Sequence, residues 1–270
     1  METVGEHPVP VGPLAVRWLA VSVPTFRAGT GSRLRVRLRN AGSAPWRSRG
    51  TEGVQAAYHW LDPLGNAIDW DGRRHAFPRP VAPGDETELE LTVAAPRPPG
   101  RYRLALDLVQ EFHFWFEEVG SHPLALDVDV LPRIEARRLA VRVHGDEDGA
   151  TAAALAAQEE PLVATDAVAT AHLVAGALPA RDWSRRLLDA HAEGFAAVGG
   201  SVESRERALR PWQPGGGRNP GFAHPLLLPS LLAGLDPGEH LGLPAHHPRE
   251  DAWLYDGRIR LRLPRGRRRA

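Results

Sequence analysis

The chain has 270 residues, 33 acidic and 33 basic side chains, and 43% hydrophobic residues, which predicts two domains with packed cores. The charge balance excludes a general attraction to nucleic acid, and the absence of Cys excludes disulfides, thiolate metal sites and cysteine nucleophiles. All basic residues are Arg, which is typical of a GC-rich bacterial genome. No secretory signal and no apolar run of about 20 residues is present, so we expect a cytoplasmic protein without a transmembrane segment.

Strict alternation of polar and apolar residues marks the first half of the chain. The clearest case is Arg33–Arg39, where Arg alternates with Leu or Val. Such a period of two predicts antiparallel strands with one buried and one solvated face. We predict strands at 14–23, 33–39, 54–61, 86–93, 101–109 and 124–130, joined by Gly-, Pro- and Asn-containing turns. The expected fold of residues 14–131 is an Ig-like antiparallel β-sandwich, preceded by a disordered leader at 1–13.

The pattern changes after residue 131. We predict helices at 149–158 and 181–193, and strands at 139–143, 162–164, 172–175, 195–198 and 258–263. Alternating strands and helices indicate a small α/β domain over residues 132–264, with an irregular Pro/Gly-rich C-terminal part. The second helix places Trp183, Leu187, Leu188 and His191 along one side and ends at Gly194 as its C-cap. A basic tail occupies residues 265–270.

The motifs of the first half carry a family resemblance. They are Asn40-Ala41-Gly42 before Trp46, Tyr58-His59-Trp60, Pro83-Gly84-Asp85, and Pro98-Pro99-Gly100 before Tyr102. This set resembles the Ig-like domains named after the central domain of the autophagy receptor next-to-BRCA1. The resemblance implies a place beside glycosyltransferase and methyltransferase modules of bacterial surface-polysaccharide pathways. We expect Trp46 and Trp60 to be buried with partners for their indole N–H groups, and Tyr102 to fix a strand corner.

Two groups of aromatic and charged residues are candidates for ligand binding. The first occupies the loop 66–78 and the second lies near a strand end; together their candidate residues are Trp70, Asp71, Arg73, Arg74, Glu111, His113 and Trp115. Aromatic rings with Arg and carboxylates on loops suit sugars or peptides, through stacking and bidentate hydrogen bonds. The alternative is a surface cluster without a ligand.

The second half is faintly similar to a partial family-2-type glycosyltransferase. Asp146 and Asp148 resemble that family's metal-binding D-x-D, and Glu250-Asp251 resembles its late acid/base motif. The resemblance implies Mn²⁺ or Mg²⁺ at Asp146 and Asp148 and a catalytic role for Glu250 or Asp251. The usual opening strand is missing, and the acidic pair follows the first strand of the domain, where a helix N-cap also explains it.

A third candidate is an anion site at Gly215, Gly216, Gly217 and Arg218. Consecutive glycines let backbone N–H groups converge on an anion, although no nucleotide fingerprint follows. A surface loop is the alternative. The Arg residues of the tail suit weak contact with an anionic surface, and we expect no specific nucleic acid partner.

These features favour a non-catalytic accessory or binding protein whose Ig-like module takes a glycan or a protein partner in bacterial surface-polysaccharide assembly. We expect no cofactor, and a metal only for a glycosyltransferase-type enzyme using a nucleotide-sugar, which is the first alternative. The second alternative is a structural or assembly protein that pairs through the edges of its sandwich.

Overall fold

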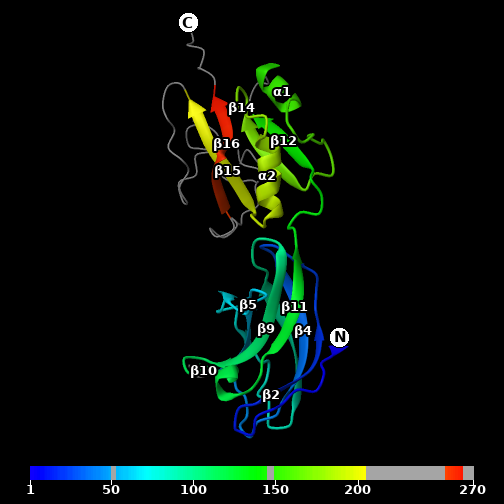
Figure 1. Cartoon of the computed structure of the whole chain (residues 1–270), viewed down its shortest axis with the longest axis vertical. Coiled ribbons are helices and arrows are strands. Elements are labelled where there is room, and N and C mark those ends of the chain that lie inside the picture. Colours follow the sequence, from blue (N-terminus) through cyan, green and yellow to red (C-terminus); the bar gives the residue numbers. More distant parts are fainter. Residues whose placement is uncertain (50–52, 145–148, 205–252, 264–270) are drawn as a thin grey trace. The chain divides into compact units, whose positions relative to one another are not determined.

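The computed structural model describes residues 1–49, 53–144, 149–204 and 253–263. It divides into two units, Met1–Leu131 and Pro132–Ala270, each of which has a hydrophobic core of its own (Figure 1). Strands dominate the described residues of both units, and two α-helices are described, both in the second unit.

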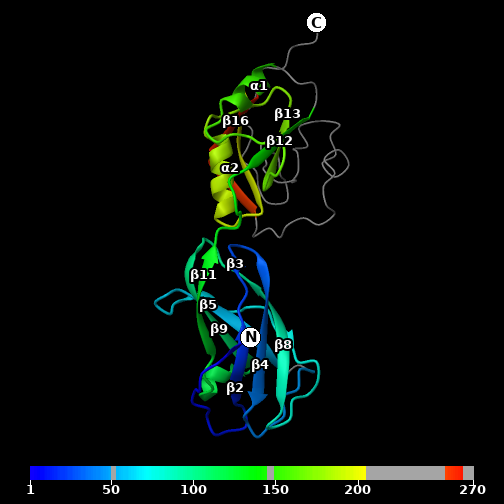
Figure 2. The ribbon, with the colours of Figure 1, turned by 90° about the vertical axis from the view of Figure 1, so that its right-hand side faces the viewer.

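The first unit is a sandwich of two sheets (Figure 2). The four-stranded sheet has the order β1 (Glu2–Thr3), β2 (Val16–Ser22), β4 (Gly31–Asn40) and β8 (Glu86–Ala94). The seven-stranded sheet follows the path β3 (Phe26–Arg27), β11 (Leu124–Leu131), β9 (Gly100–Gln110), β5 (Val54–Leu61) and β6 (Ala67–Asp69), with β7 (His75–Ala76) on β5 and β10 (Phe114–Trp115) on β9. All pairs are antiparallel except β3 with β11. This partition of strands is that of an Ig-like sandwich.

The long strands follow the predicted alternation. The predicted strand 54–61 coincides with β5, and the other five predicted strands of this unit are confirmed with small changes at their ends. In β4, Leu34, Val36 and Leu38 are fully buried, whereas the Arg residues between them are exposed. Across the solvent face, Arg35 and Arg39 pair with glutamates of β8 at 3.2 and 2.5 Å. The alternation therefore supplies both a core face and a charge-matched outer face.

The large aromatic residues of the core were also predicted. Trp46 and Trp60 are fully buried, and the Trp60 indole N–H donates to the Ala94 carbonyl across the core at 2.7 Å. Within the described residues the Trp46 indole has no such partner, contrary to the expectation. The Tyr102 hydroxyl donates to the Pro98 carbonyl at 2.6 Å, which confirms the predicted strand corner.

The expected disordered leader has defined contacts. Strand β1 pairs with β2, and the Val4 N–H donates to the Leu19 carbonyl at 2.9 Å. The open edge of β2 offers unpaired backbone groups, and the leader satisfies them. The sequence did not indicate this because two paired residues carry no periodicity.

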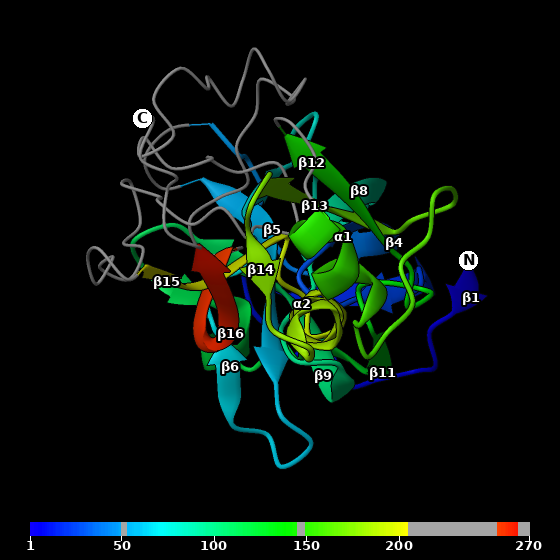
Figure 3. The ribbon, with the colours of Figure 1, turned by 90° about the horizontal axis from the view of Figure 1, so that it is seen from above.

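The described residues of the second unit form two small sheets (Figure 3). Strands β12 (Leu139–His144) and β13 (Ala169–Val174) are parallel, and helix α1 (Gly149–Ala156) lies between them in the sequence. The other sheet has the order β14 (Leu178–Pro179), β16 (Trp253–Leu263) and β15 (Ala197–Ser204). Helix α2 (Trp183–Ala192) packs beside β15 and β16.

Helix α2 buries Trp183, Leu187, Leu188 and His191, as predicted. Its C-cap is Glu193, and Gly194 follows with φ 112°. The Phe195 N–H donates to the Ala190 carbonyl at 3.2 Å and the Gly194 N–H to the His191 carbonyl at 3.1 Å. This is a Schellman ending, so Gly194, predicted as the C-cap, lies one position beyond the observed C-cap Glu193.

Several strand predictions in this unit were wrong in extent: β16 begins at Trp253 and not at residue 258, and β13 begins at Ala169 and not at residue 172. Strand β15 starts at Ala197 and continues through Gly199 and Gly200, where we expected it to end. Gly200 suits a strand here because a Cβ would lie 2.0 Å from the Ile259 carbonyl oxygen of β16. Of the predicted strand 162–164, only a single bridge from Leu162 to Leu139 forms.

Candidate functional site

The candidate residues of the first unit gather on the outer face of the seven-stranded sheet. Along β5, Tyr58 and Trp60 point into the core, so the alternating residues Ala57 and His59 face outward. In register across the sheet, His59 lies opposite Ala105 and Ala57 lies opposite Asp107 of β9. Although they are on the outer face, His59, Ala57 and Asp107 are almost completely buried. Two chain segments cover them.

The first cover is the loop between β6 and β7. The Gly72 N–H donates to the Tyr58 carbonyl at 3.1 Å, which holds this loop against β5. A Cβ at Gly72 would lie 2.3 Å from the Tyr58 carbonyl oxygen, so no larger residue permits this approach. The loop thereby carries Trp70 over the outer face of the sheet.

The second cover is the hairpin of β9 and β10. Trp115 lies opposite Val109 in this hairpin and packs with Val109 and Ala57. The turn between the strands is closed by the His113 N–H, which donates to the Gln110 carbonyl at 3.0 Å. Phe112 occupies this turn with φ 63°, a conformation that is uncommon for an aromatic residue. The hairpin brings Trp115 over the same place on the sheet as the loop.

The two covers meet at His59. The rings of His59 and Trp70 are stacked, with centroids 4.0 Å apart and an interplanar angle of 21°. The Trp115 ring meets His59 edge-on at 4.2 Å, and the guanidinium carbon of Arg74 lies 4.6 Å from the centre of the Trp115 ring. These are favourable aromatic and cation–π arrangements. We refer to His59, Trp70, Arg74 and Trp115 as the aromatic cluster.

Arg74 joins the loop to the hairpin. Its Nε donates to Glu111 at 2.8 Å, and its terminal nitrogens donate to the Gly72 carbonyl at 2.9 Å and to Asp71 at 3.0 Å. The Arg74 and Glu111 side chains are 26% and 20% exposed, so their ion pair is largely shielded from water. Both groups therefore hold the cluster in place, and the guanidinium has few donors left for a ligand.

The protonation state of His59 follows from its contacts. Nδ1 lies within hydrogen-bond distance of the Trp70 carbonyl oxygen, so the ring donates from Nδ1 and Nε2 is the acceptor. Burial lowers the pKa of the His59 imidazole, which keeps the ring neutral at physiological pH. Among the described residues, nothing pairs with the buried Nε2. A neutral, orientated imidazole is a flat support for the Trp70 indole.

The solvent-facing part of the site is small. Trp70 is 42% exposed, and His59 stacks on one face of its indole. Asp71 and Arg73 follow Trp70 on the loop and are exposed. His113 is exposed beside Phe112, which is 87% exposed, whereas Trp115 is only 8% exposed. Trp115 therefore supports the site from below, and Trp70 with Asp71 and Arg73 forms its surface.

Sequence reasoning missed three residues of this region. His59 entered the sequence analysis only within the motif Tyr58-His59-Trp60, yet its alternation with Tyr58 and Trp60 already places it on the outer face. Asp107 is fully buried, and burial raises its pKa to about 7 although the N–H groups of Leu108 and Glu117 donate to it. Phe112 carries no local pattern that predicts a positive φ.

The other candidates lie outside the described residues. They are Asp146, Asp148, Gly215, Gly216, Gly217, Arg218, Glu250, Asp251 and the tail 265–270. In the described part of the chain, no group of three or more His, Asp or Glu side chains is placed to hold a metal ion. None of the helices in that part has the length and apolar character needed to span a membrane.

Comparison with known proteins gives structural likenesses at low sequence identity. No protein-family model matches the chain, and no curated protein matches it. The C-terminal domain of wzt matches with 9% identity and a TM-score of 0.30, over 44% of this chain and 75% of that domain. A family 123 glycoside hydrolase from Clostridium perfringens matches with 10% identity and a TM-score of 0.25, over 44% of this chain and 25% of the hydrolase. The ASH/PapD-like domain of human CEP192 matches with 15% identity and a TM-score of 0.23, over 47% of this chain and 92% of that domain.

Proposed function

We propose that this chain is a non-catalytic binding protein whose Ig-like sandwich binds a carbohydrate at Trp70. The observation that carries the proposal is the stacked pair of Trp70 and His59, which leaves an exposed indole held flat on a buried, neutral ring. A sugar ring has an apolar C–H face that packs on such a surface, and its hydroxyls suit the neighbouring Asp71 carboxylate and Arg73 guanidinium. An indole that is already fixed loses little conformational entropy when a ligand binds.

The ionisable groups of the site favour binding over catalysis. Arg74 and Glu111 bond to each other, and His59 Nδ1 bonds to the Trp70 carbonyl, so these groups are engaged within the protein. A general acid or base must instead reach a substrate within hydrogen-bond distance. The exposed groups are Trp70, Arg73 and Asp71, whose carboxylate is 75% exposed although one of its oxygens accepts from Arg74, and these are of the types that position a ligand. The resemblance of residues 14–131 to the Ig-like domains named above favours a setting in bacterial surface-polysaccharide assembly. We propose that the second unit is a small α/β partner domain.

A glycan array followed by calorimetric titration tests this function. The full chain is screened against bacterial oligosaccharides, and the best ligand is titrated into wild type, Trp70→Ala and Trp70→Phe. We expect Trp70→Ala to weaken binding by about tenfold or more and Trp70→Phe to weaken it less, because Phe keeps part of the stacking surface. Ile68→Ala is the matched control, since Ile68 is a 50% exposed apolar residue in β6, directly before the loop that carries Trp70.

Two outcomes contradict the proposal. One is an array on which the wild-type chain retains no oligosaccharide. The other is a ligand whose affinity is the same in wild type and in Trp70→Ala, which would place the binding surface elsewhere on the chain.

A further inference from the structure

Phe112 is an exposed aromatic residue that the proposed function does not use. Its side chain is 87% exposed, and it occupies the turn of the β9–β10 hairpin with φ 63°. Gly or Asn adopts this left-handed conformation more easily than Phe does. Neither burial nor the geometry of the turn therefore explains an aromatic ring at this position.

Exposed rings of Trp, Tyr or Phe occur at two positions among the described side chains. These are Trp70, on the loop between β6 and β7, and Phe112, on the hairpin. The loop and the hairpin are the two segments that cover the outer face of the seven-stranded sheet and meet at His59. Both exposed rings thus belong to one region of the first unit.

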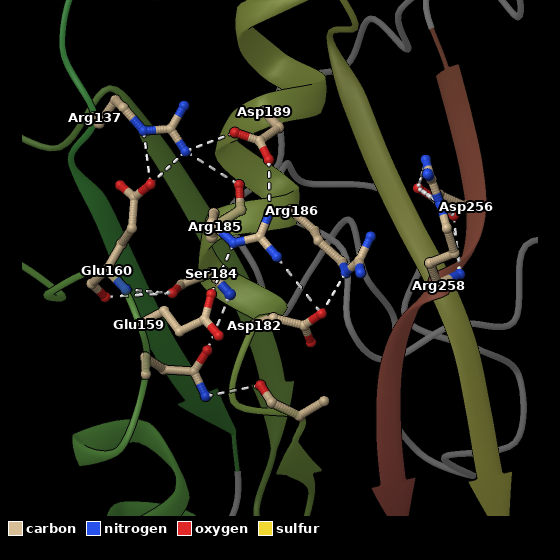
Figure 4. Close-up of polar contacts among 12 residues, drawn as sticks. Arg137, Glu159, Glu160, Asp182, Ser184, Arg185, Arg186, Asp189, Asp256 and Arg258 are labelled. Atoms are coloured by element: carbon tan, nitrogen blue, oxygen red, sulfur yellow. Dashed lines mark hydrogen bonds and ion pairs between the residues drawn. The ribbon is translucent and has the colours of Figure 1, made fainter.

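The described side chains of the second unit show no such pair. Trp183 is fully buried there, and Phe195 is partly buried. The charged side chains around α2 bond to one another, as Figure 4 shows: Arg185 donates to Glu159 at 2.7 Å and to Asp189 at 3.2 Å. These contacts fasten α2 to the segment that follows α1, which stabilises the unit.

Two contacts fix the hairpin relative to the loop that carries Trp70. Glu111, the residue before Phe112, accepts a hydrogen bond from Nε of Arg74 on the loop at 2.8 Å. On the same hairpin, the centroid of the Trp115 ring lies 6.2 Å from that of Trp70. The segments that carry Phe112 and Trp70 are therefore joined before any ligand binds.

Polar side chains flank both exposed rings in the sequence. They are Asp69 and Asp71 on the loop, and Glu111 and His113 on the hairpin. A protein partner is usually held by a contiguous apolar centre, which two separate rings among polar groups do not provide. A chain of sugars suits such a surface, because its apolar C–H faces pack on the rings and its hydroxyls bond to the polar groups between them.

We propose that Phe112 is a second stacking surface of the carbohydrate site and that the ligand is an oligosaccharide. One sugar ring packs on Trp70, and another sugar ring of the same molecule packs on Phe112. This assignment, which rests on the proposed carbohydrate function, adds the class of ligand to it. Since the protein joins both segments in advance, the second contact adds affinity at little further entropic cost.

Calorimetric titration of the full chain with ligands of different length tests the assignment. The probes are the oligosaccharide that the glycan array retains best and the monosaccharides that compose it. We expect Phe112→Asn to weaken oligosaccharide binding by about tenfold and to change monosaccharide binding by less than about twofold. Phe112→Tyr keeps a ring and should stay within about twofold of wild type. Leu64→Ala is the matched control, since Leu64 is 88% exposed in the turn between β5 and β6.

The stability of Phe112→Asn separates binding from folding. Because the ring is exposed and Asn adopts a positive φ more easily, we expect a urea midpoint equal to or above that of wild type. A clearly lower midpoint would make Phe112 a structural residue and would overturn the assignment.

The titrations distinguish failure of this assignment from failure of the proposed function. Equal oligosaccharide affinity of wild type and Phe112→Asn, together with a loss in Trp70→Ala, overturns the role of Phe112 alone. Equal losses for oligosaccharide and monosaccharide in Phe112→Asn also overturn it, since Phe112 would then act through Trp70. If Trp70→Ala has no effect, or if the array retains no oligosaccharide, the proposed function and the role of Phe112 fail together.

Discussion

At the scale of single residues, Asp107 is the most unusual group in the sandwich. It lies on the outer face of β9 but has no exposed surface, because the hairpin of β9 and β10 covers it. Two backbone N–H groups donate to its carboxyl, yet burial dominates and raises its pKa to about 7. Its neighbours Glu117 and Glu118 raise the pKa further, because a second negative charge nearby is unfavourable.

This shift predicts a specific dependence of stability on pH. Between the ordinary pKa of 3.8 and about 7, the unfolded chain has released the Asp107 proton and the folded protein still holds it. The free energy of unfolding therefore contains a contribution that is present below the ordinary pKa and is lost as the pH rises through about 7. The size of this contribution is at most roughly 4 kcal/mol.

Replacement of Asp107 by Asn removes this contribution. Buried His59 and half-buried His75 have lowered pKa values and act in the opposite direction, but they are present in both proteins and cancel in the comparison. We expect the difference in stability, Asp107→Asn minus wild type, to grow in favour of the variant as the pH rises from about 4 to about 8. Urea denaturation at each pH measures it. Parallel curves for the two proteins would contradict the predicted pKa of Asp107.

At the scale of elements, the loop between β6 and β7 depends on one close approach. Gly72 touches β5 at the Tyr58 carbonyl, and the atom that a Cβ would meet there belongs to the backbone. A backbone oxygen cannot rotate away, so a side chain at this position must push the loop off the strand. The stacking of Trp70 on His59 follows from the position of the loop and should be lost with it.

Gly72→Ala should therefore both destabilise the sandwich and expose Trp70. We expect a loss of about 1–3 kcal/mol, as for other overpacked sites, and stronger quenching of Trp fluorescence by acrylamide. Gly12→Ala is the control, because a Cβ at Gly12 meets nothing within 4 Å. Unchanged quenching in Gly72→Ala would show that the loop accommodates the methyl group without moving.

Elements also differ in how readily their sequence reveals them. Strands β4, β5, β8 and β9 were predicted because each holds an alternating face over many residues. Strands β6, β7 and β10 have two or three residues, too few for a period, and they form only because β5 and β9 offer open backbone groups. These three short strands position the whole candidate site, so its framework was the least predictable part of the fold.

At the scale of the whole molecule, each unit closes its own core. The core of the first unit draws its residues from Val16 to Val130, and that of the second draws its residues from Leu139 to Leu261. A core that is complete within one stretch of chain does not need the other stretch for burial of its apolar surface.

The fragment 1–131 should consequently fold by itself. We expect a cooperative urea transition and a near-UV circular dichroism spectrum with ordered Trp signals. The hydrogen bond from the Tyr102 hydroxyl to the Pro98 carbonyl should be retained in the fragment. The full chain is the comparison and should show a transition with the same midpoint for this unit. A fragment without near-UV signal would mean that the sandwich requires the second unit.

The sequence by itself determined the sandwich of the first unit, the burial of its aromatic core, and the membership of Trp70, Asp71, Arg73 and Arg74 in an exposed loop. Alternation and turn chemistry are properties of neighbouring residues, so they can be read without knowing which strands pair. Only the tertiary structure decided that Arg74 bonds to Glu111, 37 residues away, and that Trp70 rests on His59. These contacts join segments that are distant in the chain, and they depend on sheet register and on the course of the covering loops, which no local pattern contains.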